Sequence, residues 1–219
     1  MPINFKFSYQ VEIAKRVLRT VALLVLAAFT MNAYSASKTI VVLGDSLSAE
    51  YGLARGEGWV NLLQKKLETG KISAAIVNAS ISGETTSGGA TRLQALLDKH
   101  KPAVVVIELG ANDALRGLSL TATQQNLRAM VAAAQKAKAR VLLVGMQIPP
   151  NYGTDYTRQF AALYPKIAKE TKSALVPFML QGVADKANLF QADRIHPSAE
   201  AHPIILNNIW PQLKPLLTK

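Results

Sequence analysis

The feature that most constrains the fold of this sequence is an alternation of short apolar segments with longer segments of helical periodicity. Five segments have the length and apolar character of strands, namely 39–43, 72–77, 104–109, 140–145 and 174–177. Helical spacing is found at 60–67, 92–100, 123–138, 156–172 and 198–217, where Pro203 marks a kink or a restart. Strands that alternate with such helices form crossover units. The sequence therefore predicts an α/β fold built on a parallel sheet.

The length and composition of the chain fit one domain. A chain of 219 residues, of which 49% are hydrophobic, can bury one sizeable core. No internal repeat, low-complexity tract or interdomain linker interrupts the pattern. We therefore expect a single domain over residues 36–219, and its size is compatible with a monomer.

The first residues of the chain differ in kind from the rest. Four basic side chains precede an apolar run over residues 21–31, and small residues follow at 33–36. The run is about half as long as the ~20 residues that a membrane-spanning helix needs. The pattern predicts a secretory signal peptide at residues 1–35, cleaved after Ser35, and hence a periplasmic or secreted protein. Cleavage after Ala36 and an uncleaved anchoring helix are the alternatives.

Composition excludes several kinds of site. The chain has no Cys, so it has no disulfide, no Cys nucleophile and no thiolate metal site. Its net charge is +11. Residues 1–35 carry four bases and one acid, so the remainder keeps 21 bases and 13 acids, a net charge of +8. These bases are scattered among helical positions without interleaved aromatic residues, so we interpret them as solvated helix faces and expect no nucleic-acid partner.

Polar segments follow the expected strands. In open parallel sheets, ligands bind beyond the carboxyl ends of the strands. The segments that follow the strands here are 44–48, 78–86, 110–113, 147–153 and 193–197. We expect these segments to converge at one edge of the sheet and to form the functional site there.

Ser46 is the candidate nucleophile for acyl transfer. It comes directly after the first strand, in the sequence Gly44-Asp45-Ser46, where Gly44 permits a sharp turn. We expect Ser46 to open a helix whose N–H groups face the group that the serine attacks. The alternative is a plain helix N-cap, which this motif alone does not distinguish from a nucleophile.

The three histidines narrow the choice of a general base. His100 ends an expected helix, and His202 lies within the last one, where it is structural or solvated. His196 lies in a loop, three residues after Asp193. A carboxylate at this spacing can hold Nδ1 of the imidazole and leave Nε2 to face a serine. The alternative role of this pair is to cap the following helix.

Donors for an oxyanion complete the requirements of acyl transfer. The candidates are the backbone N–H groups of Ser46 and Gly83 and the side-chain amide of Asn112, although Asn112-Asp113 is also typical of an ordinary turn. No group of His and acidic residues has the spacing of metal ligands, so we expect neither a metal nor a cofactor. Together these residues fill every role that acyl transfer needs.

Four blocks of the sequence resemble the GDSL lipase/esterase family, also called the SGNH hydrolases. The blocks are Gly44–Ser48, Gly83, Gly110–Asp113 and Asp193–Pro197. They occur in the order that is typical of the family. The resemblance implies a flavodoxin-like three-layer α/β/α sandwich with a mostly five-stranded parallel sheet. It also implies a catalytic triad of Ser46, Asp193 and His196, and an oxyanion hole made by Ser46, Gly83 and Asn112.

Within the family, segments 44–52 and 150–153 resemble the periplasmic thioesterase/arylesterase/lysophospholipase group of Gram-negative bacteria. In that group the loop after the fourth strand lines the acyl groove, which implies substrate contacts from Ile148, Pro149 and Tyr152. The resemblance therefore places an apolar wall beside the expected nucleophile.

The sequence thus predicts a serine esterase acting on acyl esters and thioesters, including aryl esters, lysophospholipids and acyl-CoA-type substrates, with transient contact with membrane lipids. Arg194, where many relatives have a small residue, is expected to alter substrate access. Two alternatives stay open. One is a carbohydrate acetylesterase on the same fold, and the other is a non-catalytic exported lipid-binding protein.

Overall fold

The computed structural model describes residues 38–218 of the chain. The contacts within the chain place Ser37–Lys219 in one compact unit. The signal peptide predicted at residues 1–35 lies outside the described residues.

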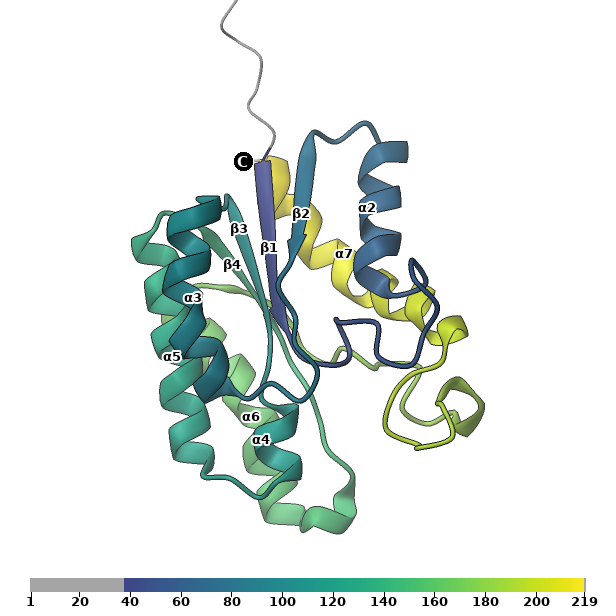
Figure 1. Ribbon diagram of the computed structural model, residues 1–219. Helices are drawn as coiled ribbons and strands as arrows, with labels where there is room; N and C mark the ends of the chain where they lie inside the picture. Colours follow the sequence, from purple (N-terminus) through teal and green to yellow (C-terminus); the bar gives the residue numbers. More distant parts are fainter. Residues whose placement is uncertain (1–37, 219) are drawn as a thin grey trace, which may run out of the picture. The chain divides into compact units, whose positions relative to one another are not determined.

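A five-stranded sheet forms the centre of this unit (Figure 1). Its strands are β1 (Lys38–Gly44), β2 (Ala74–Asn78), β3 (Val104–Glu108), β4 (Arg140–Val144) and β5 (Ala174–Val176). All neighbouring pairs are parallel, in the order β2-β1-β3-β4-β5. This is the flavodoxin-like order, whose switch point lies between β1 and β3. The predicted five-stranded parallel sheet is confirmed.

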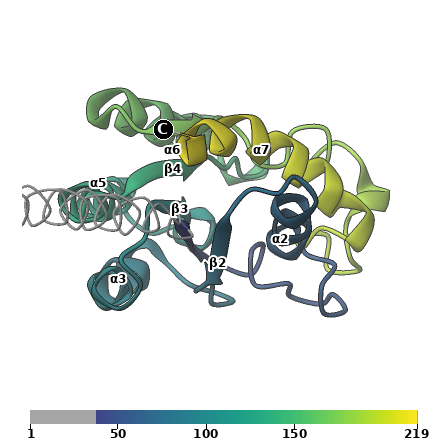
Figure 2. The ribbon, with the colours of Figure 1, turned by 90° about the horizontal axis from the view of Figure 1, so that it is seen from above.

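Helices cover both faces of the sheet. They are α2 (Trp59–Thr69), α3 (Thr86–His100), α4 (Ala111–Leu115), α5 (Leu120–Lys136), α6 (Thr154–Thr171) and α7 (His202–Thr218). Short 3-10 turns are η1 (Pro150–Tyr152), η2 (Ala187–Leu189) and η3 (Ala199–Ala201). Helices α3, α5 and α6 cover one face and α2 and α7 the other, which confirms the predicted three layers (Figure 2). Within residues 38–218, no helix is long and apolar enough to cross a bilayer.

The core lies on both sides of the central strands. Every side chain of β3 is buried, and the side chains from Ile40 to Leu43 of β1 are fully buried. Sheets that are covered on both faces favour such continuous apolar strands. The largest fully buried side chains are Trp59 from α2 and Tyr164 and Phe160 from α6. Both helical layers therefore contribute large side chains to the core that packs against the sheet.

The segment after β1 differs from the expectation. Ser46 does not open a helix but lies in a run of turns, and α2 begins only at Trp59. The N–H of Ala49 donates to the C=O of Asp45, which closes a single helical turn. Glu50 then adopts a φ of 60°, and this left-handed backbone ends the turn before a helix can propagate.

Helix α3 begins earlier than its periodicity indicates. Its first residue is Thr86, and the hydroxyl of Thr85 caps it by accepting the N–H of Gly88 at 3.3 Å. Gly88 and Gly89 hide the helical pattern in the sequence, because glycine is unfavourable within helices. A Cβ at Gly89 would lie 2.3 Å from Cδ1 of Leu109. The glycine therefore allows α3 to pack closely over the sheet.

Two further segments refine the sequence-based assignment. Asn112, expected in a loop, lies in the short helix α4. The last helical segment consists of the 3-10 turn η3 followed by α7, so it restarts near Pro203 rather than kinking there. A proline is tolerated in the first turn of a helix, where its missing N–H has no partner to lose.

His202 links the two helices that cover one face of the sheet. It is 2% exposed, and its Nδ1 accepts the N–H of Trp59 at 3.0 Å. This bond ties the start of α2 to the start of α7, next to the loops that carry the candidate site. Of the two roles expected for His202, structural or solvated, the structural one is confirmed.

We predict that His202 makes the stability of the protein depend on pH. Burial lowers the pKa of His202 below the usual value of 6.5, so the unfolded chain binds the proton more readily. The contribution of the neutral imidazole to folding stability is therefore full above about pH 7. It is lost as the pH falls below the pKa of His202 in the unfolded chain. In urea unfolding, the wild type should lose more free energy of unfolding between about pH 8 and about pH 5 than His202→Gln.

The matched control for this measurement is His100→Gln, which changes a histidine at the end of α3. It is expected to keep the pH dependence of the wild type. An equal loss of stability in the wild type and in His202→Gln would show that the buried imidazole does not couple protonation to unfolding.

Candidate active site

Ser46 meets two side chains that are far from it in the sequence at the carboxyl edge of the sheet. It is the second residue after β1, and its Oγ lies 2.9 Å from Nε2 of His196. Nδ1 of the same imidazole lies 2.6 Å from Oδ2 of Asp193. Ser46 is half-buried, so its hydroxyl is held by the fold and still reachable. This is the geometry in which an imidazole can take a proton from a serine.

The loop that carries Asp193 and His196 is fixed by its own hydrogen bonds. Oδ1 of Asp193 accepts the N–H groups of Ile195 and His196 at 2.9 and 3.0 Å. These two bonds, followed by the bond from the His196 side chain, lower the pKa of Asp193 to about 2. The carboxylate therefore stays ionised at neutral pH and can hold the imidazole in one orientation.

Two backbone N–H groups that the sequence predicts as oxyanion donors are free within the described residues. Within residues 38–218, the N–H groups of Ser46 and Gly83 donate to no other residue. Gly83 adopts a φ of 78°, a left-handed conformation that favours glycine, and its C=O accepts Nη2 of Arg116 at 2.9 Å. Unpartnered donors next to a nucleophile are what an oxyanion hole requires.

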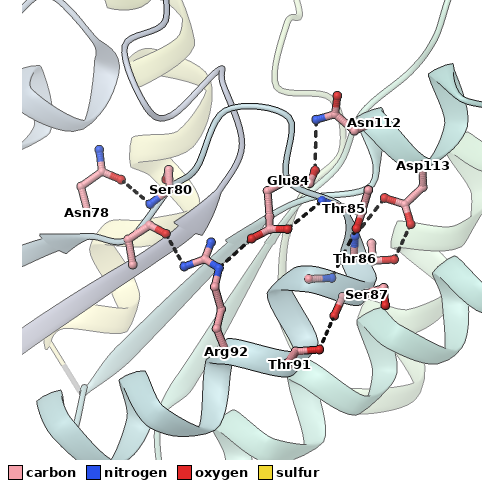
Figure 3. A network of polar contacts seen from close by, with 12 residues as sticks. Asn78, Ser80, Glu84, Thr85, Thr86, Ser87, Thr91, Arg92, Asn112 and Asp113 are labelled. Atoms are coloured by element: carbon pink, nitrogen blue, oxygen red, sulfur yellow. Dashed lines mark hydrogen bonds and ion pairs between the residues drawn. The ribbon is translucent and has the colours of Figure 1, made fainter.

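The side-chain amide of Asn112 is occupied in this structure. Its Nδ2 donates to the C=O of Glu84 at 3.1 Å (Figure 3). The same Nδ2 donates to Oδ2 of Asp45 at 3.0 Å, so both hydrogens have acceptors. A developing oxyanion would have to share or replace one of these two acceptors. The amide is thus held beside the site by two residues from different strand ends.

An apolar groove of about 540 Å³ runs along the edge of the sheet. Of the residues expected to contact substrate, Ile148 and Pro149 line it, whereas Tyr152 ends η1 with an exposed side chain and is not among the lining residues. Arg194 and Ile195 line the groove next to the histidine. The wall also contains the large apolar side chains of Leu115, Met146, Phe178, Leu180 and Phe190.

The sequence of this site matches a known family. A model of the GDSL-like lipase/acylhydrolase family matches residues 42–204 of the chain. The chain belongs to this family. The matched range contains Ser46, Gly83, Asn112, Asp193 and His196. The protein is therefore an enzyme of the GDSL type, a hydrolase of carboxylic esters.

Relatives in the GDSL family are similar over most of their length. The esterase TesA of Pseudomonas aeruginosa is 50% identical over 192 residues, which cover 88% of this chain and 96% of TesA. Thioesterase 1/protease 1/lysophospholipase L1 of Escherichia coli K12 is 42% identical over 84% of this chain and 86% of its own. A crystal structure of TesA, 52% identical, superposes with a TM-score of 0.81 and covers 82% of this chain and 100% of the other.

Two buried carboxylates lie behind the serine of this GDSL enzyme. Asp45 is 1% exposed and Glu108 is 0% exposed. Oε2 of Glu108 accepts the N–H of Asp45 at 3.3 Å and the hydroxyl of Ser48 at 2.7 Å. Burial raises the pKa of Asp45 to about 6, and burial and the charge of Asp45 raise the pKa of Glu108 well above its usual value. Since like charges this close disfavour double ionisation, Glu108 holds its proton more strongly than an exposed carboxyl group does.

No pattern in the sequence points to these two carboxyl groups as partners. The available signal was Glu108 itself, the one acidic residue in an otherwise wholly apolar strand. Asp45 was seen only as part of the turn that presents the serine. Its partnership with Glu108 depends on the pairing of β1 with β3, which the order of elements along the chain does not determine.

Tyr51 was also missed. Its ring lies 4.3 Å from the ring of His196, measured between centroids, with an angle of 37° between the planes. Its C=O accepts Nε2 of Gln191 at 2.9 Å, which joins the turn after β1 to the histidine loop. An aromatic ring over the imidazole restricts its rotation and shields one side of it from water.

The donor groups of the described chain are not arranged for metal binding. Between residues 38 and 218, no three His, Asp or Glu side chains are grouped so that they could hold a metal ion.

We predict that the ring of Tyr51 contributes to catalysis by orienting His196. Tyr51→Ala is expected to lower kcat/KM for an aryl ester by about 3- to 10-fold, because this factor corresponds to the free energy of one aromatic contact. Tyr51→Phe keeps the ring and should stay within about 2-fold of the wild type. Steady-state kinetics of both variants, together with their thermal unfolding, make the measurement. Wild-type kcat/KM in Tyr51→Ala would show that the ring does not orient the histidine.

Proposed function

We propose that this enzyme hydrolyses acyl esters and thioesters through a covalent acyl-enzyme on Ser46. The observation that carries the proposal is the line of hydrogen bonds from Ser46 Oγ to His196 Nε2 and from His196 Nδ1 to Asp193. A serine hydroxyl is a weak nucleophile until a base removes its proton in the transition state. Among the three histidines of the chain, His196 is the one in contact with this serine.

Each proton has a place in this mechanism. His196 takes the proton of the Ser46 hydroxyl as the oxygen attacks the acyl carbon, and Asp193 stabilises the imidazolium. The imidazolium then protonates the leaving alcohol or thiol as its bond to the acyl carbon breaks. Water attacks the acyl-enzyme, gives a proton to His196, and the proton returns to Ser46 as the carboxylic acid departs. No cofactor enters these steps.

The oxyanion of both tetrahedral intermediates would be bound by the free N–H groups of Ser46 and Gly83 and by the amide of Asn112. The hydrogen bonds from preorganised donors of this kind become stronger as negative charge develops on the acyl oxygen. The two free N–H groups support the first two donors. The third donor requires Asn112 to share one of its hydrogens, now bound by Asp45 and Glu84, with the oxyanion.

The groove supports acyl chains as substrates. Its wall is built mostly from aliphatic and aromatic side chains, and an acyl chain that lies against them buries apolar surface. The relatives named esterase and thioesterase/lysophospholipase point to the same substrate classes. We propose aryl esters, lysophospholipids and acyl-CoA-type thioesters. Ile148 and Pro149 would contact the chain, and Tyr152 would contact the part of the substrate that extends beyond the groove.

Three further properties are part of the proposal. We expect export after removal of residues 1–35, as the basic and apolar pattern at the start of the sequence predicts. We expect a monomer to be active, because Ser46, Asp193 and His196 all come from one chain. We expect transient contact with membrane lipids, since lysophospholipids are drawn from lipid surfaces and the chain after residue 35 has a net charge of +8.

We predict that hydrolysis of p-nitrophenyl esters depends on Ser46 and favours medium or long acyl chains. Ser46→Ala should lower kcat by at least ~10³-fold, because it removes the attacking oxygen. Rates are measured from acetate to palmitate for both proteins. Ser87→Ala, the same change on the exposed side of α3, is the control and should match the wild type.

The same series separates the alternatives. A Ser46-dependent maximum at acetate would indicate a carbohydrate acetylesterase with a short acyl pocket. A wild type without activity on any ester would contradict the proposal and leave a lipid-binding protein.

A further inference from the structure

The loop from Ala79 to Glu84 carries the Gly83 N–H and follows β2. Its first half is attached to β1, because the N–H of Ala79 donates to Val42 and the N–H of Ile81 donates to Gly44, at 2.8 and 3.0 Å. Beyond Ile81 the loop leaves the sheet, and the side chain of Ile81 is 51% exposed. The half that presents Gly83 therefore depends on contacts other than the strand ladder.

Arg92 supplies such contacts at both ends of the loop. From the second turn of α3, its Nη1 donates to the C=O of Ala79 at 2.5 Å and its Nε donates to Oε2 of Glu84 at 2.8 Å (Figure 3). One planar guanidinium thus joins the first and last residues of the loop. A guanidinium presents its donors in a fixed geometry, so two such bonds fix a distance as well as an orientation.

The ion pair between Arg92 and Glu84 is partly buried. The side chains are 23% and 13% exposed, so solvent and salt screen the pair less than they screen a surface pair. Oε1 of Glu84 accepts the N–H of Thr85 at 3.1 Å. Gly88 makes room for this carboxylate, because a Cβ there would lie 1.9 Å from Oε1 of Glu84. The first turn of α3 is thus shaped to hold the carboxylate.

Glu84 connects this pair to two of the three proposed oxyanion donors, Gly83 and Asn112. It directly follows Gly83, so its backbone position sets the plane of the neighbouring peptide groups. Its C=O accepts Nδ2 of Asn112 at 3.1 Å. A shift of Glu84 would therefore move the amide of Asn112 and disturb the left-handed conformation of Gly83 at the same time.

We propose that Arg92 is a positioning residue for the oxyanion hole, acting through Glu84 on Gly83 and Asn112. The proposal rests on the function proposed above for Ser46. Arg92 touches no reacting atom, so its removal leaves the nucleophile, the base and the groove in place. Its removal changes the position of two hydrogen-bond donors, the Gly83 N–H and the Asn112 amide, relative to the acyl oxygen on which negative charge forms.

This role has a kinetic signature. Loss of one oxyanion donor lowers kcat by roughly 10²- to 10³-fold, and partial displacement of two donors should cost less. Arg92→Gln is expected to lower kcat by about 10- to 100-fold and to change KM by less than about 2-fold. Glu84→Gln keeps a carbonyl acceptor of the same shape and should lower kcat by about 3- to 10-fold.

Inhibitor binding separates positioning from a general structural role. An alkyl boronic acid forms a tetrahedral adduct with a serine and places an oxygen in the oxyanion hole, whereas the fatty acid product tests binding in the groove. In Arg92→Gln, affinity for the boronic acid should fall by about the same factor as kcat, and product inhibition should stay unchanged. Equal losses in both affinities would contradict positioning.

The chain provides a matched control. Arg128 of α5 pairs with Glu170 of α6 at 2.6 Å, on the surface and away from the loop. Arg128→Gln makes the same chemical change and should leave kcat, KM and boronic acid affinity within about 2-fold of the wild type. Arg92→Lys keeps the charge but cannot make both bonds. It should lie between wild type and Arg92→Gln, and it carries the test if Arg92→Gln fails to fold.

The outcomes distinguish this inference from the proposed function. A wild type with Ser46-dependent turnover and an Arg92→Gln variant with wild-type kcat would overturn the role of Arg92 alone. A fall in kcat matched by the boronic acid affinity, with unchanged product inhibition, supports it. Absence of Ser46-dependent turnover in the wild type would contradict the proposed function first.

Discussion

The parallel pairing that sets Gly44 of β1 opposite Glu108 of β3 is the junction on which the candidate site depends. A Cβ at Gly44 would lie 2.7 Å from Oε2 of Glu108 and 2.8 Å from the side chain of Ser48. Because the glycine leaves this space, one buried carboxyl group reaches the N–H of Asp45 and the hydroxyl of Ser48. These two hydrogen bonds fix the turn from Asp45 to Ser48 from its buried side. The turn carries Ser46 at the edge of the sheet.

The architecture was predictable from the sequence because its signals are local. Apolar runs such as 104–109 report strands buried on both faces, and their alternation with helical segments specifies parallel crossover connections. The pairing of Asp193 with His196 was predictable for the same reason, since three residues in one loop suffice for the contact. The meeting of this loop with Ser46 followed from the rule that strand carboxyl ends share one edge.

The remaining parts of the site depend on contacts between distant segments. The register of β1 against β3 brings Asp45 and Glu108 into contact. No local sequence pattern around either residue predicts this contact. Tyr51 reaches His196 only because the expected helix after β1 is replaced by turns. In the sequence, Arg92 has the pattern of an ordinary basic residue of an amphipathic helix. Its contacts with the loop of Gly83 arise only when α3 packs beside that loop. Propensity and periodicity contain no information on such pairs.

The most direct test of Ser46 as the nucleophile held by this junction is mass spectrometry of the protein after reaction with a fluorophosphonate. This reagent forms a covalent bond with a serine that a neighbouring base activates. The expected result is one adduct per chain, located on the peptide that contains Ser46 and absent when the protein is unfolded before treatment. An unmodified Ser46 peptide, or an adduct on a different serine, would contradict the assignment.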